Sequence, residues 1–142
     1  MIQLKIRPGT EADKPALREL FLRVRQQTFL WVDPATLRLE DFDKATEGEA
    51  ILVAEVEGAI AGFVSWWPPE NFLHNLYIDT SRQRAGVGAA LLQACLERTG
   101  RPVRLKTSIQ NASAIAFYRK HGFKVASNGF AEEGEYYLME QP

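Results

Sequence analysis

The residues from Gln83 to Ala89 have the composition of a loop that binds a phosphate group. Gly86 and Gly88 carry no Cβ atom, so an anion can approach the main chain closely there. The segment precedes a predicted helix, whose first turn offers unpaired N–H groups and the positive end of the helix dipole. It is therefore a candidate anion cradle, although a lone G-x-G also occurs as a turn that only tightens a strand-to-helix connection.

Two common phosphate-binding motifs do not fit this segment. A Rossmann G-x-G-x-x-G motif needs a third glycine where the sequence has Leu91, and the Lys-Ser/Thr pair of a P-loop is absent. The function of the cradle must therefore be read together with the other motifs of the chain.

A second pattern extends from Asn111 to Phe123. Asn111 is a good helix N-cap, Phe117 and Tyr118 belong to the short helix that follows, and Gly122 supplies a left-handed stop. A tyrosine on such a helix is most often a half-buried packing residue, but its phenol can also donate a proton.

The hydrophobic pattern predicts the strands and helices that must position these residues. The first helix begins at a cap on Thr10 or Asp13 and runs to about Thr28, and Glu57-Gly58 marks a hairpin. Strands are predicted near residues 2–7, 50–57, 59–67, 72–79, 103–109, 123–126 and 135–140, and further helices near 34–46, 87–99 with a C-cap at Gly100, and 111–121.

The order of these elements, β-α-α-β-β-β-α-β-α-β-β, predicts a single α/β domain over residues 1–142 with a mixed sheet. Consecutive antiparallel strands come first. The connection from residues 72–79 to 103–109 is long enough for a parallel, right-handed crossover. Ligands are then expected at the carboxyl ends of these two parallel strands.

Composition narrows the classes of function. The 142 residues are 46% hydrophobic and 25% charged, which is typical of a globular protein, and the formal net charge of −1 argues against a nucleic-acid partner. One cysteine and two histidines leave no basis for a disulfide framework or a metal site. No apolar run is long enough to span a membrane, and no secretory signal is present, so we expect a cytoplasmic protein, with a homodimer left open.

Together the two motifs resemble those of the GNAT superfamily of N-acetyltransferases, and the resemblance covers nearly the whole chain. Gln83-x-x-Gly86-x-Gly88 fits the family's Q/R-x-x-G-x-G/A pyrophosphate motif, and residues 111–123 fit N-x-x-A-x-x-x-Y-x-x-x-G-F. The resemblance implies a three-layer fold with splayed central parallel strands and acetyl-CoA as cosubstrate. It implies cofactor contacts, largely through the main chain, at Leu76, Tyr77, Ile78, Gln83, Arg84, Ala85, Gly86, Val87, Gly88, Ala89, Asn111 and Tyr118.

Acetyl transfer to an amine requires a neutral nucleophile, a donor to the carbonyl oxygen and protonation of the departing thiolate. The resemblance assigns the last role to Tyr118 and the second to a backbone N–H near Leu76. Cys95 lies inside a predicted helix without an activating base. Direct transfer in a ternary complex is therefore expected in place of a covalent acyl-enzyme.

The base is a separate question. In many relatives a carboxylate stands two residues before the Leu-Tyr-Ile segment, where this sequence has His74. An imidazole with a pKa near 6.5 can accept a proton at neutral pH. His74 shares one face of the predicted strand with Leu76 and Ile78. His74 is therefore a candidate base, and a histidine held by a hydrogen bond at a strand edge is the structural alternative. In that case a nearby carboxylate or water is the candidate base.

The acceptor is an open choice among amines of small molecules, peptides and proteins. Trp31, Trp66 and Trp67 lie in segments that border the acceptor cleft in relatives, and each could equally be a packing residue. Glu132, Glu133 and Glu135 could attract a cationic amine or form solvated surface. Two other classes of function stay open: a non-catalytic acyl-CoA-binding sensor and a nucleotide-binding domain of another fold.

Overall fold

Four antiparallel strands form the first half of the sheet. A computed structural model describes residues 3–83 and 85–142. The strands are β1 (Leu4–Pro8), β2 (Ala50–Val56), β3 (Ala59–Trp67) and β4 (Phe72–Ile78). Glu57 and Gly58 both have positive φ, 53° and 82°, in the tight β2–β3 hairpin that the Glu57-Gly58 pair predicts.

The second half of the sheet consists of β5 (Val103–Ser108), β6 (Lys124–Ala131) and β7 (Gly134–Gln141). The spatial order is β1-β2-β3-β4-β5-β7-β6. Strand β5 runs parallel to β4, but a single pair, Phe72 with Arg104, joins the two. Beyond that pair the strands diverge, so the expected splay of the central parallel strands is confirmed.

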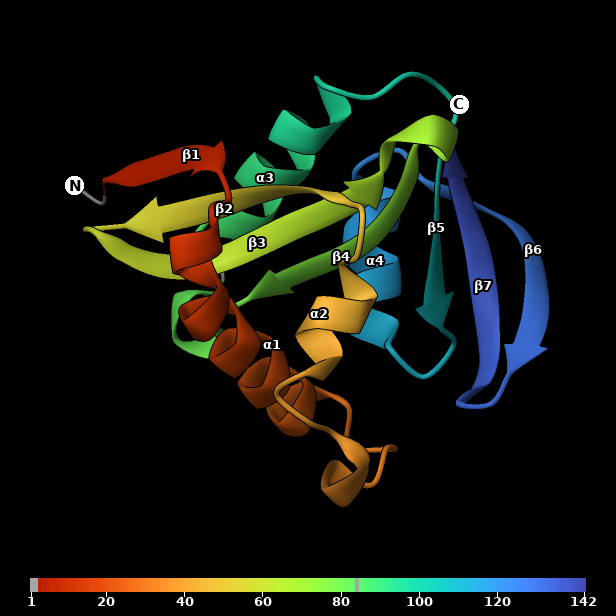
Figure 1. The fold of residues 1–142 in the computed structure, drawn as a ribbon. Helices are drawn as coiled ribbons and strands as arrows, with labels where there is room; N and C mark the ends of the chain where they lie inside the picture. Colours follow the sequence, from red (N-terminus) through yellow and green to blue (C-terminus); the bar gives the residue numbers. More distant parts are fainter. Residues whose placement is uncertain (1–2, 84) are drawn as a thin grey trace.

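Helices cover both faces of this sheet and make three layers (Figure 1). The helices α1 (Lys14–Thr28) and α2 (Asp41–Ala45) lie on one face, called here the α1/α2 face, and α3 (Val87–Leu96) and α4 (Ala112–Lys120) on the other. Each face has its own buried hydrophobic cluster. Short 3-10 turns occupy Glu11–Asp13, Pro34–Thr36, Pro68–Glu70 and Thr80–Arg82. No helix among the described residues is long and apolar enough to cross a membrane.

Helix α1 begins directly after Asp13, and its apolar residues pack as the sequence predicts, whereas the sequence does not predict the burial of Arg25. Asp13 accepts the Thr10 N–H at 2.8 Å, and the buried residues of the helix are Leu17, Leu20, Phe21, Val24 and Arg25. Asp13 also receives two hydrogen bonds from Arg7 of β1. The Arg7 guanidinium holds the pKa of this carboxyl well below its usual range, and the pair fixes the start of α1 against the sheet.

The helix predicted over residues 34–46 is largely wrong. Only Pro34–Thr36 and Asp41–Ala45 are helical, and Leu37 between them is extended, with a ψ of 134°. The buried guanidinium of Arg25 contacts the Asp41 carboxylate and the Arg38 carbonyl, both at 3.2 Å. Because a tertiary contact uses this carbonyl, the chain turns where the local pattern favours a helix.

Two other predicted boundaries are also wrong. Helix α3 ends at Leu96 instead of Thr99, and Gly100 is not its cap, because the Gly100 N–H donates to the Asn71 side chain at 3.1 Å. Strand β6 continues past residue 126 to Ala131, because it pairs with β7 along the hairpin. Its polar stretch at Ser127 to Gly129 resembles a turn in the sequence, which explains the shorter prediction.

Candidate active site

The glycine segment adopts the geometry of an anion cradle. Gly86 has a φ of +82° and stands at the N-cap of α3, and a Cβ at Gly86 would meet no atom within 4 Å. The first intrahelical bond is donated by Ala90 to the Gly86 carbonyl at 3.0 Å, so the N–H groups of residues 87–89 precede the helical ladder. Bare backbone, open space and a helix dipole therefore coincide here, as a diphosphate requires. Arg84, also predicted for the cradle, lies outside the described residues.

The backbone edge of β4 that faces the splay is the second part of the site. The Asp79 N–H donates to the Ala61 carbonyl of β3 at 2.8 Å. Because N–H and C=O groups alternate sides along a strand, those of Ile78 and Leu76 point away from β3, toward the splay. The Gln83 side-chain amide already reaches the Ile78 carbonyl, at 3.4 Å. These groups belong to the segment at which the resemblance implies main-chain contacts with the cofactor.

The side chains of the same strand separate onto the two faces. Leu76 and Ile78 pack against the cluster under α3 and α4. Tyr77 belongs to the opposite cluster, with its ring 4.8 Å from that of Phe21 and 5.8 Å from that of Phe63, and burial raises its pKa to about 12. Any contact of Tyr77 with a cofactor would therefore involve its main chain.

Tyr118 lies on α4, in the cluster under α3 and α4. Its ring packs edge-on against Phe117 and Phe123, and 8% of the residue is exposed. Its hydroxyl makes no hydrogen bond within the described part of the chain, yet it is not among fully buried unpaired atoms, so it borders accessible space. Burial raises the pKa of the phenol above its ordinary value. Tyr118 is therefore a neutral donor, and a weaker acid than an exposed tyrosine.

Asn111 caps α4 as predicted. Its side-chain oxygen accepts the Ala114 N–H at 3.3 Å, which fixes the start of the helix that carries Tyr118. Cys95 is fully buried in α3, and burial raises its pKa to about 12. A thiol in that environment is a core residue, as the sequence predicts, and offers no nucleophile for an acyl-enzyme.

His74 occupies a β-bulge, and this corrects one expectation. Ser65 pairs with Asn75 and Trp66 with Leu73, so His74 is an extra residue on β4. The bulge shifts the alternation by one position. Leu73, not His74, therefore shares the face of Leu76 and Ile78 in the cluster under α3 and α4.

The imidazole of His74 instead joins a polar network on the α1/α2 face. Its Nδ1 lies 2.6 Å from Oε2 of Glu49, which comes just before β2. The other oxygen of Glu49 accepts the Ser65 hydroxyl at 2.8 Å. Asn75 donates to that hydroxyl at 2.8 Å and to the Ala45 carbonyl at the end of α2 at 3.0 Å. The hydrogen bond to Glu49 raises the pKa of His74.

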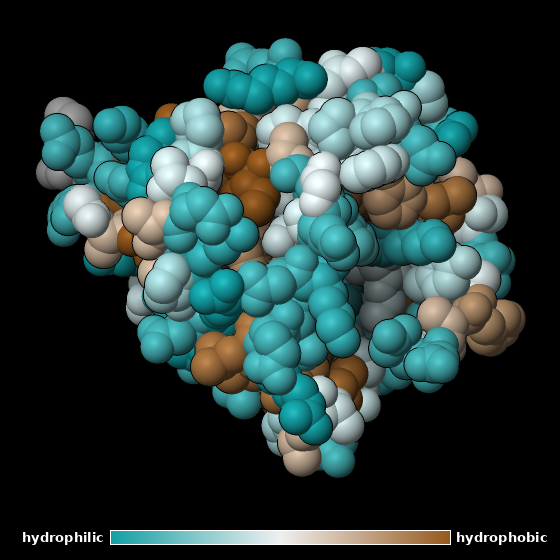
Figure 2. All heavy atoms as spheres, in the orientation of Figure 1, coloured by the Kyte–Doolittle hydropathy of each residue, from teal (hydrophilic) through white to brown (hydrophobic). Residues whose placement is uncertain are grey.

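The candidate acid and base therefore lie on opposite faces of the sheet. Tyr118 belongs to the α3/α4 side, in the same buried cluster as Val87 of α3, and His74 to the α1/α2 side. The space-filling view of the α1/α2 face shows a mostly hydrophilic surface with a shaded hollow between the side of α2 and that of β6 and β7 (Figure 2). Glu49 was missed from the sequence, because no local pattern connects it with a histidine 25 residues later.

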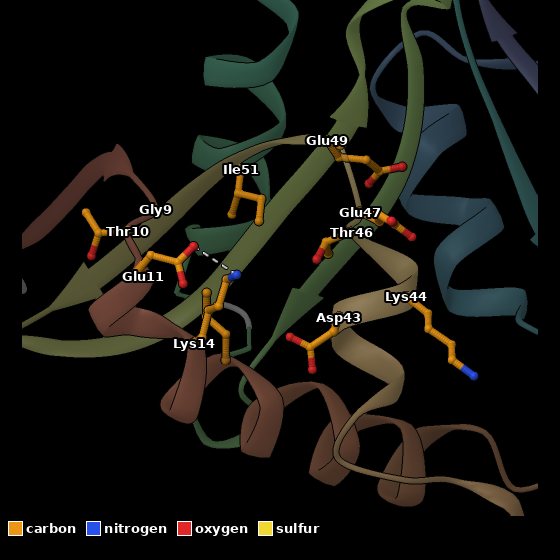
Figure 3. Close-up of a pocket in the computed structure, with 12 residues that line it drawn as sticks. Gly9, Thr10, Glu11, Lys14, Asp43, Lys44, Thr46, Glu47, Glu49 and Ile51 are labelled. Atoms are coloured by element: carbon orange, nitrogen blue, oxygen red, sulfur yellow. Dashed lines mark ion pairs between the residues drawn. The ribbon is translucent and has the colours of Figure 1, made fainter.

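A cleft of about 760 Å³ lies between the start of α1 and α2 (Figure 3). Ion pairs of Lys14 with Glu11 and of Arg18 with Asp43 occupy this region. Glu49 stands at its border, but its carboxylate points toward β3 and β4, away from Thr10 and Lys14. Glu49 thus belongs both to the lining of the cleft and to the His74 network.

The residues considered for the acceptor fall into different environments. Trp66 is buried in the core, Trp67 is partly exposed against Gly48, and Trp31 stacks on Phe29 with ring centroids 5.1 Å apart. Of the three glutamates near the β6–β7 turn, Glu135 accepts a hydrogen bond from Asn128 at 2.8 Å. Across residues 3–83 and 85–142, no three His, Cys, Asp or Glu side chains come together as metal ligands.

Comparison with known proteins gives the family. A model described as "Acetyltransferase (GNAT) domain" matches residues 47–125, which include Glu49, His74, the cradle and Tyr118. The chain is 30% identical over 139 residues to an L-methionine sulfoximine/L-methionine sulfone acetyltransferase of Pseudomonas aeruginosa, with 85% of this chain and 80% of the relative covered.

Solved structures agree on the fold. The apo form of YjaB from Escherichia coli superposes with a TM-score of 0.81 at 21% identity, over 98% of this chain and 97% of that one. The PaiA N-acetyltransferase of Thermoplasma acidophilum, solved in complex with coenzyme A, gives a TM-score of 0.79 at 19% identity, with 98% of each chain covered. The family match, the relative and the shared fold lead to one conclusion: this chain belongs to the GNAT acetyltransferase family.

Proposed function

We propose that this protein transfers the acetyl group of acetyl-CoA to a primary amine by direct attack in a ternary complex. The observation that carries the proposal is the splay. It leaves the backbone groups of Leu76 and Ile78 without a strand partner on the side of β5, where the Gln83 side-chain amide contacts the Ile78 carbonyl. A pantetheine arm needs such an open strand edge, and a diphosphate needs a cradle such as the one at Gly86.

In this proposal the main chain binds the cosubstrate. The N–H groups from Val87 to Ala89 bind the diphosphate, and the backbone of Leu76 and Ile78 bonds the pantetheine amides. The Gln83 side-chain amide contacts the Ile78 carbonyl at 3.4 Å. When pantetheine binds, Gln83 would either release this carbonyl or donate to it together with a pantetheine amide. Acetyl-CoA supplies an activated thioester, and every other function comes from groups of this chain.

The proposed reaction moves two protons in opposite directions. His74 accepts the proton that the amine loses as its nitrogen bonds to the acetyl carbon. A backbone N–H near Leu76 donates to the carbonyl oxygen as negative charge develops there. Tyr118 donates its phenolic proton to the sulfur as the C–S bond breaks, and solvent restores both side chains. The products are one amide and one free thiol, with no oxidant or reductant consumed.

The printed name of one relative indicates which acceptor class to test first. The Pseudomonas relative is named for an amino-acid derivative that bears an α-amine, L-methionine sulfoximine. An α-amine of a small amino-acid derivative is therefore the first acceptor to test. Amines at peptide N-termini and on lysine side chains form the second and third classes.

A panel of amines tests the proposal directly. The protein is incubated with acetyl-CoA and each amine, free thiol is measured, and the acetylated product is identified by mass spectrometry. We expect thiol release that depends on the amine and a mass increase of one acetyl group on that amine. Tight CoA binding without thiol release for any of the three classes would contradict the proposal and favour the non-catalytic sensor.

A further inference from the structure

We infer that Glu49 is the positioning residue for His74: it holds the neutral imidazole with its proton on Nδ1 and so presents Nε2 as the base. The role of His74 as a base rests on the proposed function. The contact itself, from Nδ1 of His74 to Oε2 of Glu49 at 2.6 Å, does not depend on it.

The geometry of this contact decides which nitrogen is available. A carboxylate can only accept a hydrogen bond, so the ring nitrogen beside it must carry hydrogen. Nδ1 is that nitrogen, and the lone pair of a neutral imidazole is then on Nε2. The side chain of His74 is 50% exposed, whereas that of Glu49 is 7% exposed. The pair thus has a buried anchor and an accessible base.

The anchor is fixed by more than its partner. Oε1 of Glu49 receives the Ser65 hydroxyl, and Asn75 donates to the same hydroxyl and to the end of α2. The Glu49 N–H donates to the Thr46 carbonyl at 3.0 Å in the turn before β2. A nearly buried carboxylate that is held by two donors and a turn has little freedom to move away from His74.

The charged groups around His74 determine the direction of its titration. The hydrogen bond to Glu49 contributes most and raises the pKa of His74, whereas partial burial of the ring lowers it. The Ala45 carbonyl at the end of α2 raises this pKa further, and Lys106 of β5 lowers it. The hydroxyl of Ser65 and the amide of Asn75 complete the α1/α2 side without a charge. The base works in its neutral form, so activity should rise with pH through this raised pKa. Removal of the Glu49 charge should move that rise to lower pH.

An NMR titration tests the contact without any acceptor. The chain has two histidines, so a His121→Gln background leaves the His74 ring signals alone. We expect the pKa of His74 above the ordinary histidine value and ¹⁵N shifts of an Nδ1-protonated neutral ring. Glu49→Gln should lower that pKa. The matched control is Glu47→Gln, which removes the same charge from an exposed neighbour and should change neither quantity.

Kinetic measurements on the same variants test whether the Glu49–His74 contact contributes to catalysis. In Glu49→Gln we expect the pH–kcat profile to move to lower pH and the plateau kcat to fall by about tenfold or more, with an unchanged KM for acetyl-CoA. Loss of a general base typically costs about 10²–10⁴-fold. His74→Ala should remove the limb of the profile, and Glu49→Gln added to His74→Ala should cost little more, because the two residues act as one unit.

The outcomes separate the inference from the proposed function. A wild-type His74 with its proton on Nε2, a result that needs no variant to fold, overturns the inference, as does an unchanged His74 pKa in Glu49→Gln. A limb that persists in His74→Ala overturns the base role of the pair. The expected titration together with no amine-dependent thiol release upholds the Glu49–His74 contact and contradicts only the proposed function.

Discussion

The cradle and the His74 network are the two regions of the proposed site, and they are built in different ways. The cradle is a run of neighbouring residues, and its working groups are main-chain N–H groups at Gly86 and the start of α3. The network joins side chains of Glu49, Ser65, His74 and Asn75, which come from the turn before β2, from β3 and from β4. In the proposed function, recognition by the backbone is thus encoded in neighbouring residues, whereas proton transfer depends on how distant strands are aligned.

The largest expected effect concerns Tyr118, the proposed acid, which acts through a side chain as the His74 network does but lies on the other face of the sheet. Tyr118→Phe deletes one oxygen and keeps the ring that packs on Phe117 and Phe123. We expect kcat to fall by roughly 10²–10⁴-fold, because protonation of the thiolate is lost. The affinity for acetyl-CoA should change only a few fold, because the main chain supplies most of the binding.

Turnover measured against acetyl-CoA concentration, at saturating acceptor, separates these two effects. Tyr137→Phe is the control, since it removes the same oxygen from a partly buried tyrosine of β7. A Tyr118→Phe variant that keeps more than about a third of the wild-type kcat, with chemistry rate-limiting, would make Tyr118 a packing residue.

The next effect concerns the cradle. Gly86→Val places a branched side chain where the backbone has a φ of +82° and where the Cβ enters open space. We expect the affinity for CoA, measured by calorimetry, to fall more than tenfold, which corresponds to about 1.4 kcal/mol. The side chain would occupy the space that a phosphate needs.

Gly58→Val is a matched control for backbone strain. Gly58 also has a φ of +82° and open space around its Cβ, but it lies in the β2–β3 hairpin. Left-handed backbone costs a residue with a side chain about 1–2 kcal/mol, so both variants should lose similar stability. If CoA affinity falls equally in both, strain and not the cradle explains the loss.

The sequence predicts much of the fold because many of its signals are local. Leu17, Leu20, Phe21 and Val24 recur at helical spacing, and all four are buried in α1. The helix predicted over 34–46 fails because Arg25, from α1, takes a carbonyl of the intervening segment. Nothing within residues 34–46 encodes that contact.

The same distinction explains which part of the site the sequence predicts. The spacing of Gln83, Gly86 and Gly88 identifies the cradle, since a glycine with positive φ before a helix leaves a signature in neighbouring residues. The partner of His74 has no such signature. One inserted residue in β4 changes the face of the imidazole, and a strand pattern with period two cannot reveal a bulge.

The smallest expected effect tests whether Ser65 is as necessary for catalysis as Glu49, or mainly stabilises the position of Glu49. Ser65 is fully buried, and its hydroxyl lies between Glu49 and Asn75. Ser65→Ala leaves Glu49 one donor short but preserves its contact with His74. We expect a loss of about 1–3 kcal/mol in the free energy of unfolding, measured by denaturant titration, and a fall of only a few fold in kcat. The proton of neutral His74 should stay on Nδ1.

Ser127→Ala, on the exposed part of β6, should change the free energy of unfolding by less than about 0.5 kcal/mol. Ser65 acts on Glu49, and Glu49 acts on His74, so each step away from the base should reduce the kinetic effect and leave the stability effect. If Ser65→Ala instead costs as much kcat as Glu49→Gln, the hydroxyl is as necessary as the carboxylate. Orientation of the base would then extend through Asn75 to the end of α2, and the proton-transfer region would depend on that helix as directly as the cradle depends on α3.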